Sequence, residues 1–429
     1  MTLTYFDLLR AISDGTLDHT LAPLYGDALD ARRARLADAV SAFGAAYGEE
    51  GGLMLFSVPG RSELSGNHTD HNHGCVIAAS IDLDTVAVVR PRADMAVRLL
   101  SEGFGEVSVD LDAYASPDPA RFYTTDALIA GMAACFREAG LAVGGFDAYV
   151  TSNVLAGSGL SSSAAFEVMI GTILSHLFNG GEVDRVDIAK MAQADENRFF
   201  GKPCGLMDQV ACAHGGIVAI DFADPAAPVI TSIDFDLSAA GYALCIVGTG
   251  SSHADLNDDY AAVPGEMKAV AAELGVSVLR ETDEAALIAA IPALRSRLGD
   301  RAILRALHFF AENRRVAAQT AALRAGDLDA YLADVLASGR SSFCYLQNVF
   351  TPKKVDEQGI SLALALTECA LGSLPGTAWR VHGGGFAGTI QAYVPAAHAP
   401  AYAAAIDAVF GAGACHILHI RRAGAIRIA

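Results

Sequence analysis

The segment that most constrains the fold is a run of small residues, Gly157–Ser163, between a strand-like pattern and a helix-like pattern. Glycines allow a tight turn and bring backbone N–H groups close to a ligand. The N-terminus of the following helix points its orphan N–H donors at the same place. The segment therefore predicts a strand–turn–helix unit that binds a phosphate, with a serine hydroxyl free to reach Mg²⁺. The alternative is that Ser161–Ser163 only cap the helix.

A Walker A loop is excluded, because no Gly-Lys-Ser/Thr sequence occurs in the chain. Strand-like and helix-like segments are mixed rather than regularly alternating, which predicts an α+β fold. The 429 residues favour two domains at roughly 100–200 residues each. We place the boundary near residue 235, which gives an N-terminal domain 1–235 and a C-terminal domain 236–429, tightly joined because no flexible linker is visible.

The apolar patterns predict individual elements. Expected strands are 53–58, 75–80, 85–89, 107–111, 146–154, 217–221, 229–234, 242–248, 378–381, 389–394 and a terminal strand. The first fifty residues look helical, and expected helices are 29–43, 126–139, 160–178, 186–200 (with Asp184 as N-cap), 265–274, 300–323, 328–339 and 400–410.

The charge balance excludes some classes of protein. Forty-nine Asp and Glu against 30 Lys and Arg give a formal charge of −19, which disfavours binding to nucleic acid because phosphate backbones need a basic surface. No uncharged stretch is apolar enough for a membrane span of about 20 residues, and the first residues do not resemble a secretion signal. The eight scattered cysteines suit reduced thiols. We therefore expect a cytoplasmic protein with no membrane or nucleic-acid partner.

A polar segment, 59–74, separates two apolar strand patterns and predicts a loop that binds a polar ligand. It contains Arg61, Glu63 and Asn67, followed by three histidines and Asp70. The spacing of the histidines matches no familiar metal site, although a metal cluster and a plain solvated turn both stay open.

A glycine-rich segment, 383–388, satisfies the G-x-G-x-x-G pattern. The pattern leads into an alternating strand and not into a helix, so it is not a dinucleotide-binding fingerprint. A tight turn that lines another site, or a simple hairpin, remains.

Asp208 lies among apolar residues of the segment 204–212. A carboxylate in such surroundings needs a partner or a function, because burial of an unpaired charge is costly. A structural ion pair is the alternative to a catalytic role.

Together these segments resemble the galactokinase family of the GHMP kinase superfamily. The family's three motifs have their counterparts in PGRSELSGNHTDHNHG (59–74), GSGLSSSAAFEV (157–168) and HGGGFAG (382–388), and DENRFFGKPCGLMDQ (195–209) matches the stretch before the catalytic aspartate. The resemblance covers most of the chain, with the motifs in the expected order. It implies two α+β lobes with the active site in the cleft between them, and phosphorylation of the anomeric hydroxyl of galactose by ATP.

The resemblance also implies residue roles. Asp208 is the expected catalytic aspartate and Arg61 its partner. The expected metal ligands for Mg²⁺ are Ser163 and Glu196. The ATP phosphates are expected to contact Gly157, Ser158, Gly159, Leu160, Ser161, Ser162 and Ser163, with Ser101 as a weaker match for an ATP contact. The sugar is expected to contact Asn67, His68, Thr69, Asp70, Gly205 and Tyr260, the last through a looser match.

The segment departs from the family pattern G-R-x-N-L-x-G-E-H-x-D-Y: Glu63 replaces Asn, Asn67 replaces Glu and His71 replaces Tyr, while Ala387 replaces a glycine of the third motif. These changes leave the catalytic positions intact but bear on the choice of sugar. A sugar-1-kinase for a galactose derivative or a uronic acid, and a sugar- and ATP-binding regulator without turnover, are the alternatives. The sequence does not indicate an oligomeric state.

From sequence alone, Asn67 is expected to face the sugar, where an uncharged amide binds hydroxyls less strongly than a carboxylate and tolerates an acidic sugar. D-galactose should then be accepted, and Asn67→Glu should sharpen the preference for it. The measurement is kcat/KM for galactose and galacturonate, and identical ratios in both proteins would contradict this expectation. The alternative is that Glu63 or His71 replaces the missing carboxylate.

Overall fold

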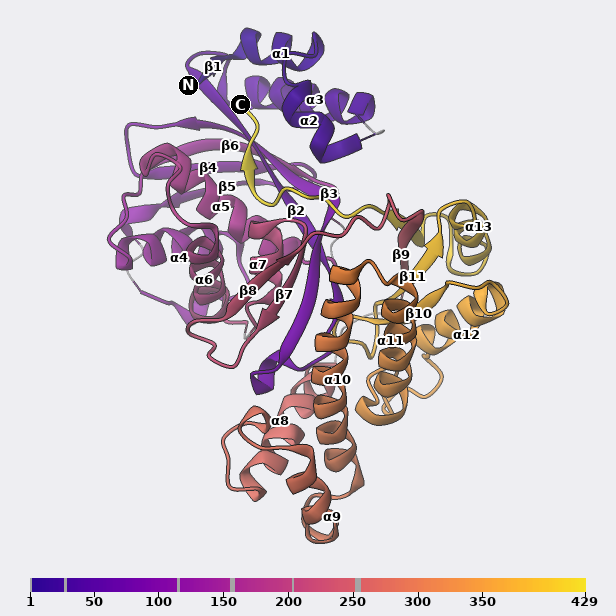
Figure 1. The fold of residues 1–429 in the computed structure, drawn as a ribbon. Coiled ribbons are helices and arrows are strands. Elements are labelled where there is room, and N and C mark those ends of the chain that lie inside the picture. Colours follow the sequence, from indigo (N-terminus) through magenta and orange to yellow (C-terminus); the bar gives the residue numbers. More distant parts are fainter. Residues whose placement is uncertain (1, 27–28, 114–115, 155–158, 203, 251–255) are drawn as a thin grey trace.

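The structure, a computed structural model, describes residues 2–26, 29–113, 116–154, 159–202, 204–250 and 256–429 (Figure 1). The strands are β1 (Leu3–Thr4), β2 (Gly52–Ser65), β3 (Cys75–Pro91), β4 (Ala96–Ser101), β5 (Glu106–Asp110), β6 (Phe146–Ser152), β7 (Ile217–Asp221), β8 (Val229–Ile233), β9 (Tyr242–Gly248), β10 (Ala378–His382), β11 (Thr389–Pro395), β12 (Cys415–Leu418) and β13 (Ile426–Arg427). The α-helices are α1 (Tyr5–Ser13), α2 (Asp18–Tyr25), α3 (Leu29–Tyr47), α4 (Thr125–Glu138), α5 (Ser162–Phe178), α6 (Arg185–Asp195), α7 (Met207–His214), α8 (Asn257–Glu273), α9 (Glu284–Leu298), α10 (Asp300–Ala325), α11 (Leu328–Ser341), α12 (Gly359–Leu371) and α13 (Ala399–Phe410).

Short helical turns complete the described elements. They are η2 (Asp70–Asn72), η3 (Leu111–Ala113), η4 (Pro119–Arg121) and η6 (Leu279–Glu281), and the π-helical turns η5 (Glu196–Phe200) and η7 (Ser342–Leu346). No helix within these described ranges is long and apolar enough to cross a membrane.

The first sheet is mixed and is built around β2 and β3. Its order is β1-β2-β3-β6-β4-β5, with β7 and β8 extending from β3 and β13 pairing with β2. Only the β4–β6 pairing is parallel among the recorded pairings. Helices α4–α7 cover one face of this sheet through a core that includes Phe56, Phe136 and Val168. Helices α1–α3 pack in a separate core against the other face of β2 and β3 (Figure 1).

The second sheet has the order β10-β11-β9-β12. Helices α12 and α13 pack on one of its faces through Ile360 and Ile406. A further buried core joins the two sheets. It contains Ile77 of β3 and Leu244 of β9 together with residues of α10 and α11. This shared core explains why no flexible linker is needed between the sheets. The chain passes from the first sheet to the second between Ile233 and Tyr242, close to residue 235, and the exact domain boundary stays a prediction.

The α+β prediction is confirmed, and most predicted elements lie within a few residues of the observed ones. Segments 217–221 and 242–248 agree at both ends, and Asp184 caps α6 by accepting from the Val186 N–H. The helix predicted for 186–200 ends at Asp195, however, and continues as the π-helical turn η5. Helices α7, α9 and α12 and strands β1 and β4 were not predicted, and two strands, β12 and β13, stand where one terminal strand was expected.

Two sequence expectations about the first sheet were wrong. The polar segment 59–74 is not a loop throughout, because β2 continues to Ser65 and carries Arg61 and Glu63 into the interior. Segments 75–80 and 85–89 form a single strand, β3, across the polar residues between them. Both continuations are possible because the polar side chains find buried partners, which a local hydrophobicity pattern does not register.

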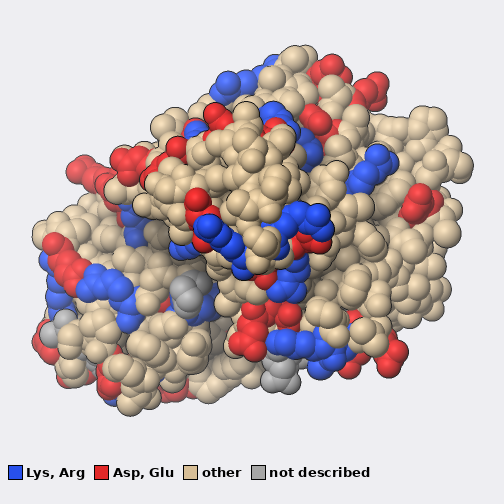
Figure 2. Space-filling view, turned by 90° about the horizontal axis from the view of Figure 1, so that it is seen from below, with Lys and Arg blue, Asp and Glu red and all other residues tan. Residues whose placement is uncertain are grey.

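Charged side chains of both signs are interspersed on the face of the molecule in Figure 2. That face does not present a single basic patch of the kind that a phosphate backbone would require.

The C-terminal segment returns to the first sheet and neutralises a buried charge. Asp84 of β3 is fully buried, and its carboxylate accepts from Tyr25 (2.6 Å), Arg35 (2.6 Å), Arg421 (3.3 Å) and Ser57. Burial alone would raise the pKa of Asp84, but the positive charges of Arg35 and Arg421 and the hydrogen bonds lower it. Helices α2 and α3, both β2 and β3, and the C-terminal segment therefore meet at one ionised carboxylate.

We expect Asp84→Asn to lower the free energy of unfolding by about 3–5 kcal/mol at pH 7, because it leaves buried guanidinium groups without their counter-charge. Since the folded pKa is lowered, the wild-type carboxylate contributes stability above its unfolded pKa of about 3.9 and loses it as the pH falls. The difference between the two proteins should therefore shrink below about pH 4 in denaturant titrations. Asp94→Asn is the control, since Asp94 also pairs with an arginine but is exposed; an equal loss there would contradict the argument.

Candidate active site

A buried ion pair joins β2 to the start of α7. Arg61 donates from Nε to Asp208 Oδ1 and from Nη2 to Oδ2, both at 2.7 Å. The Arg61 side chain is 8% exposed and that of Asp208 is 30% exposed. The guanidinium is therefore held inside the protein, while the carboxylate stays accessible to a ligand. The two parallel hydrogen bonds fix the orientation of the carboxylate.

The same arginine fixes the small-residue turn before α5. Arg61 Nη1 donates to the carbonyl of Gly159, and the Arg61 N–H donates to the carbonyl of Leu160 (3.1 Å). Gly159 has φ +72°, a conformation that favours glycine, and a Cβ there would lie 3.2 Å from Thr389 Oγ1. The turn is thus packed tightly between β2 and the start of β11.

The alternative that Ser161–Ser163 only cap α5 is wrong for Ser161. Ser161 is the N-cap residue, with φ +59°, but its side chain makes no hydrogen bond to the helix. Its hydroxyl donates to Asp208 Oδ2 instead. The helix begins at Ser162, two residues later than predicted, because Leu160 is buried beneath the turn and Ser161 is left-handed. The first N–H groups of α5 are therefore not satisfied by an N-cap side chain and are suited to an anion.

Asp208 is held ionised. Burial would raise its pKa, but the charge of Arg61 and the hydrogen bonds from Arg61 and Ser161 outweigh burial and lower the pKa. The carboxylate is thus a hydrogen-bond acceptor at neutral pH.

Ser163 and Glu196, the Mg²⁺ ligands that the family resemblance implies, lie together. Ser163 Oγ donates to Glu196 Oε1 at 3.2 Å. Lys202 Nζ lies 2.6 Å from the same oxygen, and Gln209 Nε2 donates to Glu196 Oε2 at 2.9 Å. Glu196 is 2% exposed and belongs to η5, so the π-helical turn positions this carboxylate beside the start of α5.

A further carboxylate, that of Glu167, lies near Glu196, and Gln209 Nε2 donates to both. Gln209 Nε2 donates to Glu167 Oε2 (3.2 Å), and Glu167 Oε1 is buried with no hydrogen-bond partner in the described part of the chain. Oxygen ligands and an unpartnered buried oxygen suit a hard cation such as Mg²⁺, which prefers oxygen ligands and keeps several waters or phosphate oxygens.

Residues 66–74 form the loop after β2. The Thr69 hydroxyl donates to the carbonyls of Gly66 (2.9 Å) and Cys75 (2.7 Å), and Thr69 is fully buried. Thr69 therefore closes the base of the loop. The Asp70 side chain lies against Gly205, where a Cβ would collide with Asp70 Oδ2. This contact places the Asp70 side chain beside Gly205, which lies three residues before Asp208 along the chain.

His68 and Tyr260 meet the glycine-rich turn between β10 and β11. His68 Nε2 donates to the carbonyl of Gly384 (2.8 Å), and Tyr260 donates to the carbonyl of Gly385 (2.9 Å). A Cβ at Gly384 would lie 2.6 Å from the Tyr260 ring. Burial lowers the pKa of His68 to about 4, so its imidazole is neutral at pH 7. Segment 383–388 joins the antiparallel strands β10 and β11 as a hairpin turn, and this turn contacts His68 and Tyr260.

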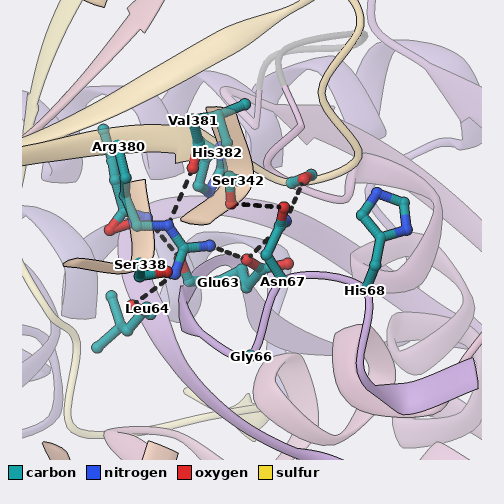
Figure 3. Close-up of polar contacts among 12 residues, drawn as sticks. Glu63, Leu64, Gly66, Asn67, His68, Ser338, Ser342, Arg380, Val381 and His382 are labelled. Carbon is teal, nitrogen blue, oxygen red and sulfur yellow. Dashed lines mark hydrogen bonds and ion pairs between the residues drawn. The ribbon is translucent and has the colours of Figure 1, made fainter. Parts of the chain in front are cut away.

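Asn67 is fully buried and is surrounded by protein groups (Figure 3). Its amide donates to Glu63 Oε1 (3.1 Å) and the carbonyl of Gly383 (2.6 Å), and its oxygen accepts from Asn348 (2.8 Å). This placement differs from the expectation that Asn67 faces a sugar hydroxyl, so the expectation that Asn67→Glu sharpens the preference for galactose no longer follows.

The remaining predicted ligand contacts are Ser101, Gly157 and Ser158. Ser101 ends β4 opposite Val150 of β6, in the sheet that leads to the turn, and its contact with ATP stays a prediction. Gly157 and Ser158 lie outside the described residues.

The sequence analysis did not single out Arg380, His382, Asn348 or Lys202. Arg380 is fully buried and pairs with Glu63, and His382 Nε2 shares a hydrogen bond with Ser62 Oγ (3.1 Å). An arginine within the apolar strand pattern 378–381 was a usable signal, because a buried charge requires a partner. Asn348 and Lys202 gave no local signal.

Comparisons with known proteins agree with this geometry. The chain matches the family model "GHMP kinases N terminal domain" over residues 127–216 and "Galactokinase galactose-binding signature" over residues 41–91. Crystal structures with the same fold include a Lactococcus lactis galactokinase complexed with galactose, with a TM-score of 0.76, 25% identity and coverage of 90% of this chain and 98% of that chain. A mevalonate kinase shares the fold at a TM-score of 0.61 and 12% identity.

Sequence relatives include galactokinases from Streptomyces coelicolor and Lactobacillus helveticus. The first is 34% identical over 364 residues, covering 83% of this chain and 89% of the relative, and the second is 33% identical over 354 residues, covering 79% and 85%. Both the matching motifs and the extent of this similarity lead to one conclusion: the chain belongs to the galactokinase family of the GHMP kinase superfamily.

Proposed function

We propose that the protein transfers the terminal phosphoryl group of ATP to the anomeric hydroxyl of D-galactose, giving galactose 1-phosphate. The observation that carries this proposal is the Arg61–Asp208 pair at the turn before α5. It combines an ionised acceptor for a hydroxyl proton, a buried cation and an anion-binding helix start at one place. Phosphoryl transfer requires mainly such positioning and neutralisation of charge.

In this proposal Asp208 accepts or shares the proton of the anomeric hydroxyl, which makes that oxygen a better nucleophile. Arg61 neutralises charge that develops on the transferred group and keeps Asp208 ionised. The Ser161 hydroxyl donates to Asp208 Oδ2 and so helps to hold the carboxylate in a fixed orientation.

The N–H groups at the start of α5 and the turn before it, including Gly159, Leu160, Ser161 and Ser162, hold the phosphates of ATP in this proposal. Ser163 and Glu196 hold Mg²⁺, which when bound supplies positive charge to the phosphate oxygens. Glu196 Oε1 also pairs with the ammonium of Lys202 at 2.6 Å, so a bound Mg²⁺ would share this carboxylate with Lys202.

His68, Asp70, Gly205 and Tyr260 bind the sugar in this proposal. Asp70 and Gly205 lie on the Asp208 side, and His68 and Tyr260 lie against the glycine turn. The similarity to a galactokinase solved with galactose supports galactose as the sugar. A regulator without turnover is disfavoured, since Arg61, Glu196 and Asp208 are all present and paired.

We expect Asp208→Asn to lower kcat with galactose by about 10²–10⁴-fold, because the amide cannot accept the proton. Calorimetric titration should find Mg-ATP binding nearly unchanged. Asp110→Asn, at the exposed end of β5, is the matched control and should keep full activity. A near-wild-type rate in Asp208→Asn would rule out the assignment of Asp208.

We expect Ser163→Ala and Glu196→Gln to raise the Mg²⁺ concentration needed for half-maximal activity and to weaken Mg-ATP binding more than galactose binding. Ser163→Ala removes an oxygen ligand of a hard cation, and Glu196→Gln replaces its charged carboxylate by a neutral amide with a single oxygen. Calorimetric titrations with Mg-ATP and with galactose separate the two effects. If Ser163 served only the helix, Ser163→Ala would instead cost about 1 kcal/mol of stability and leave the affinity for Mg-ATP unchanged.

A further inference from the structure

Every hydrogen-bonding group of the Asn67 side chain is used by the protein. The amide nitrogen donates to Glu63 Oε1 (3.1 Å) and to the Gly383 carbonyl (2.6 Å), and the oxygen accepts from Asn348 Nδ2 (2.8 Å) and Ser342 Oγ (3.3 Å). A carboxamide has two donor hydrogens and two acceptor lone pairs, so this set is complete. Asn67 is also fully buried. The side chain has no polar atom left for a sugar hydroxyl.

The four partners come from separate parts of the fold. Glu63 belongs to β2, Gly383 to the glycine turn, Ser342 to η7, and Asn348 to the segment that follows η7. The Asn67 backbone carbonyl also accepts from His308 Nε2 of α10 (2.9 Å). Asn67 therefore ties the loop after β2 to elements around the second sheet.

Glu63 is the charged member of this network. Its carboxylate pairs with the fully buried Arg380, which also donates to the Leu64 carbonyl (3.2 Å) and lies 3.9 Å from Glu312 (Figure 3). A second carboxylate beside Glu63 would meet acceptors at both positions where Asn67 now donates. The network accommodates one carboxylate and one amide at positions 63 and 67, and not two carboxylates.

The family pattern has the same two groups in the opposite order, with Asn at position 63 and Glu at position 67. This chain has exchanged them while keeping one of each. The structure gives a physical reason for the coupling of the two changes, because Asn67 Nδ2 donates to Glu63 Oε1, the same oxygen to which Arg380 donates.

We propose that Glu63 and Asn67 act as one exchanged pair, and that Asn67 is a positioning residue that holds the sugar loop and does not contact the sugar. The inference rests on the proposed galactose site and deepens it. The pair fixes the position of Asn67, and the ring of the next residue, His68, donates to the Gly384 carbonyl. The loop is therefore held on both sides of the Asn67–His68 peptide. Galactose specificity is then determined by His68 and Asp70, and not by the missing carboxylate at 67.

The first test compares Asn67→Asp with wild type, using calorimetric titration against galactose and against galactoses that lack the hydroxyl at C2, C3, C4 or C6. Asn67→Asp replaces two donors by acceptors, and we expect the Kd for each sugar to rise about ten-fold or more. The factor should be similar for every sugar, while the Kd for Mg-ATP stays within about two-fold. Loss of the effect with one deoxy sugar alone would mean that Asn67 contacts that hydroxyl and would overturn the inference.

Asn179→Asp is the matched control. Asn179 caps α5 far along the chain from the loop, and its amide also donates to two carbonyls, those of Ala142 (2.8 Å) and Leu174 (3.1 Å). It should lower thermal stability and leave galactose binding unchanged. If it raised the sugar Kd as much as Asn67→Asp does, the effect would be one of general destabilisation and the inference would fail.

The second test is the exchange itself. We expect Asn67→Glu to weaken galactose binding, and the double variant Glu63→Asn/Asn67→Glu to recover most of that loss. Effects of the two single changes that simply add in the double variant would contradict a coupled pair. If Asn67→Asp fails to fold, Ser342→Ala provides the same comparison, because it removes one donor to Asn67 and should give a smaller, equally uniform loss across the sugars. The wild-type titration separates the two proposals: no galactose binding there would contradict the proposed function, whereas a hydroxyl-specific effect contradicts only the role of Asn67.

Discussion

The structure depends on the need to neutralise two buried charges of opposite sign on one strand. Arg61 and Glu63 of β2 are 6% and 4% exposed and lie two residues apart. Removing one partner of a buried pair costs about 3–5 kcal/mol, so both partners must be brought in. Asp208 comes from α7 of the first sheet's layer, and Arg380 comes from β10 of the second sheet. Strand β2 is therefore connected by buried ion pairs to both halves of the molecule.

The irregular pairing of β2 makes this arrangement possible. Its register with β3 shifts between Pro59 and Arg61 and again between Glu63 and Ser65. Such bulges bend a strand and redirect its side chains. Arg61 is thereby able to reach both Asp208 and the Gly159 carbonyl. A single guanidinium thus orients the proposed proton acceptor and the proposed phosphate turn together, which links the two requirements of phosphoryl transfer.

Glu63, two residues after Arg61 on β2, lies on the proposed sugar side of the site. Glu63 and Asn67 connect the strand to Arg380 and to the glycine turn that His68 and Tyr260 contact. A buried polar network of this kind is stabilising only when its members are satisfied, because each unpaired group in a low-dielectric interior is costly. That condition explains why a change at position 67 is matched by a change at position 63. It also separates the proposed site into a proposed phosphate side, organised by Arg61, and a proposed sugar side, organised by Glu63 and Asn67.

The sequence by itself determined the fold class, most helices and strands, and the order of the motifs, because hydrophobic periodicity and glycine positions act over a few residues. It also brought Ser163 together with Glu196 and Arg61 with Asp208 through the family resemblance. Only the tertiary structure decided that β2 continues through Arg61 and Glu63, that the Ser161 hydroxyl serves Asp208, and that Asn67 is enclosed by protein. The partners of these buried groups lie far away in the chain: Asp208 is 147 positions from Arg61, and Arg380 is 317 from Glu63. No local pattern records a partner at that distance, and burial makes the partner decide what each polar side chain does.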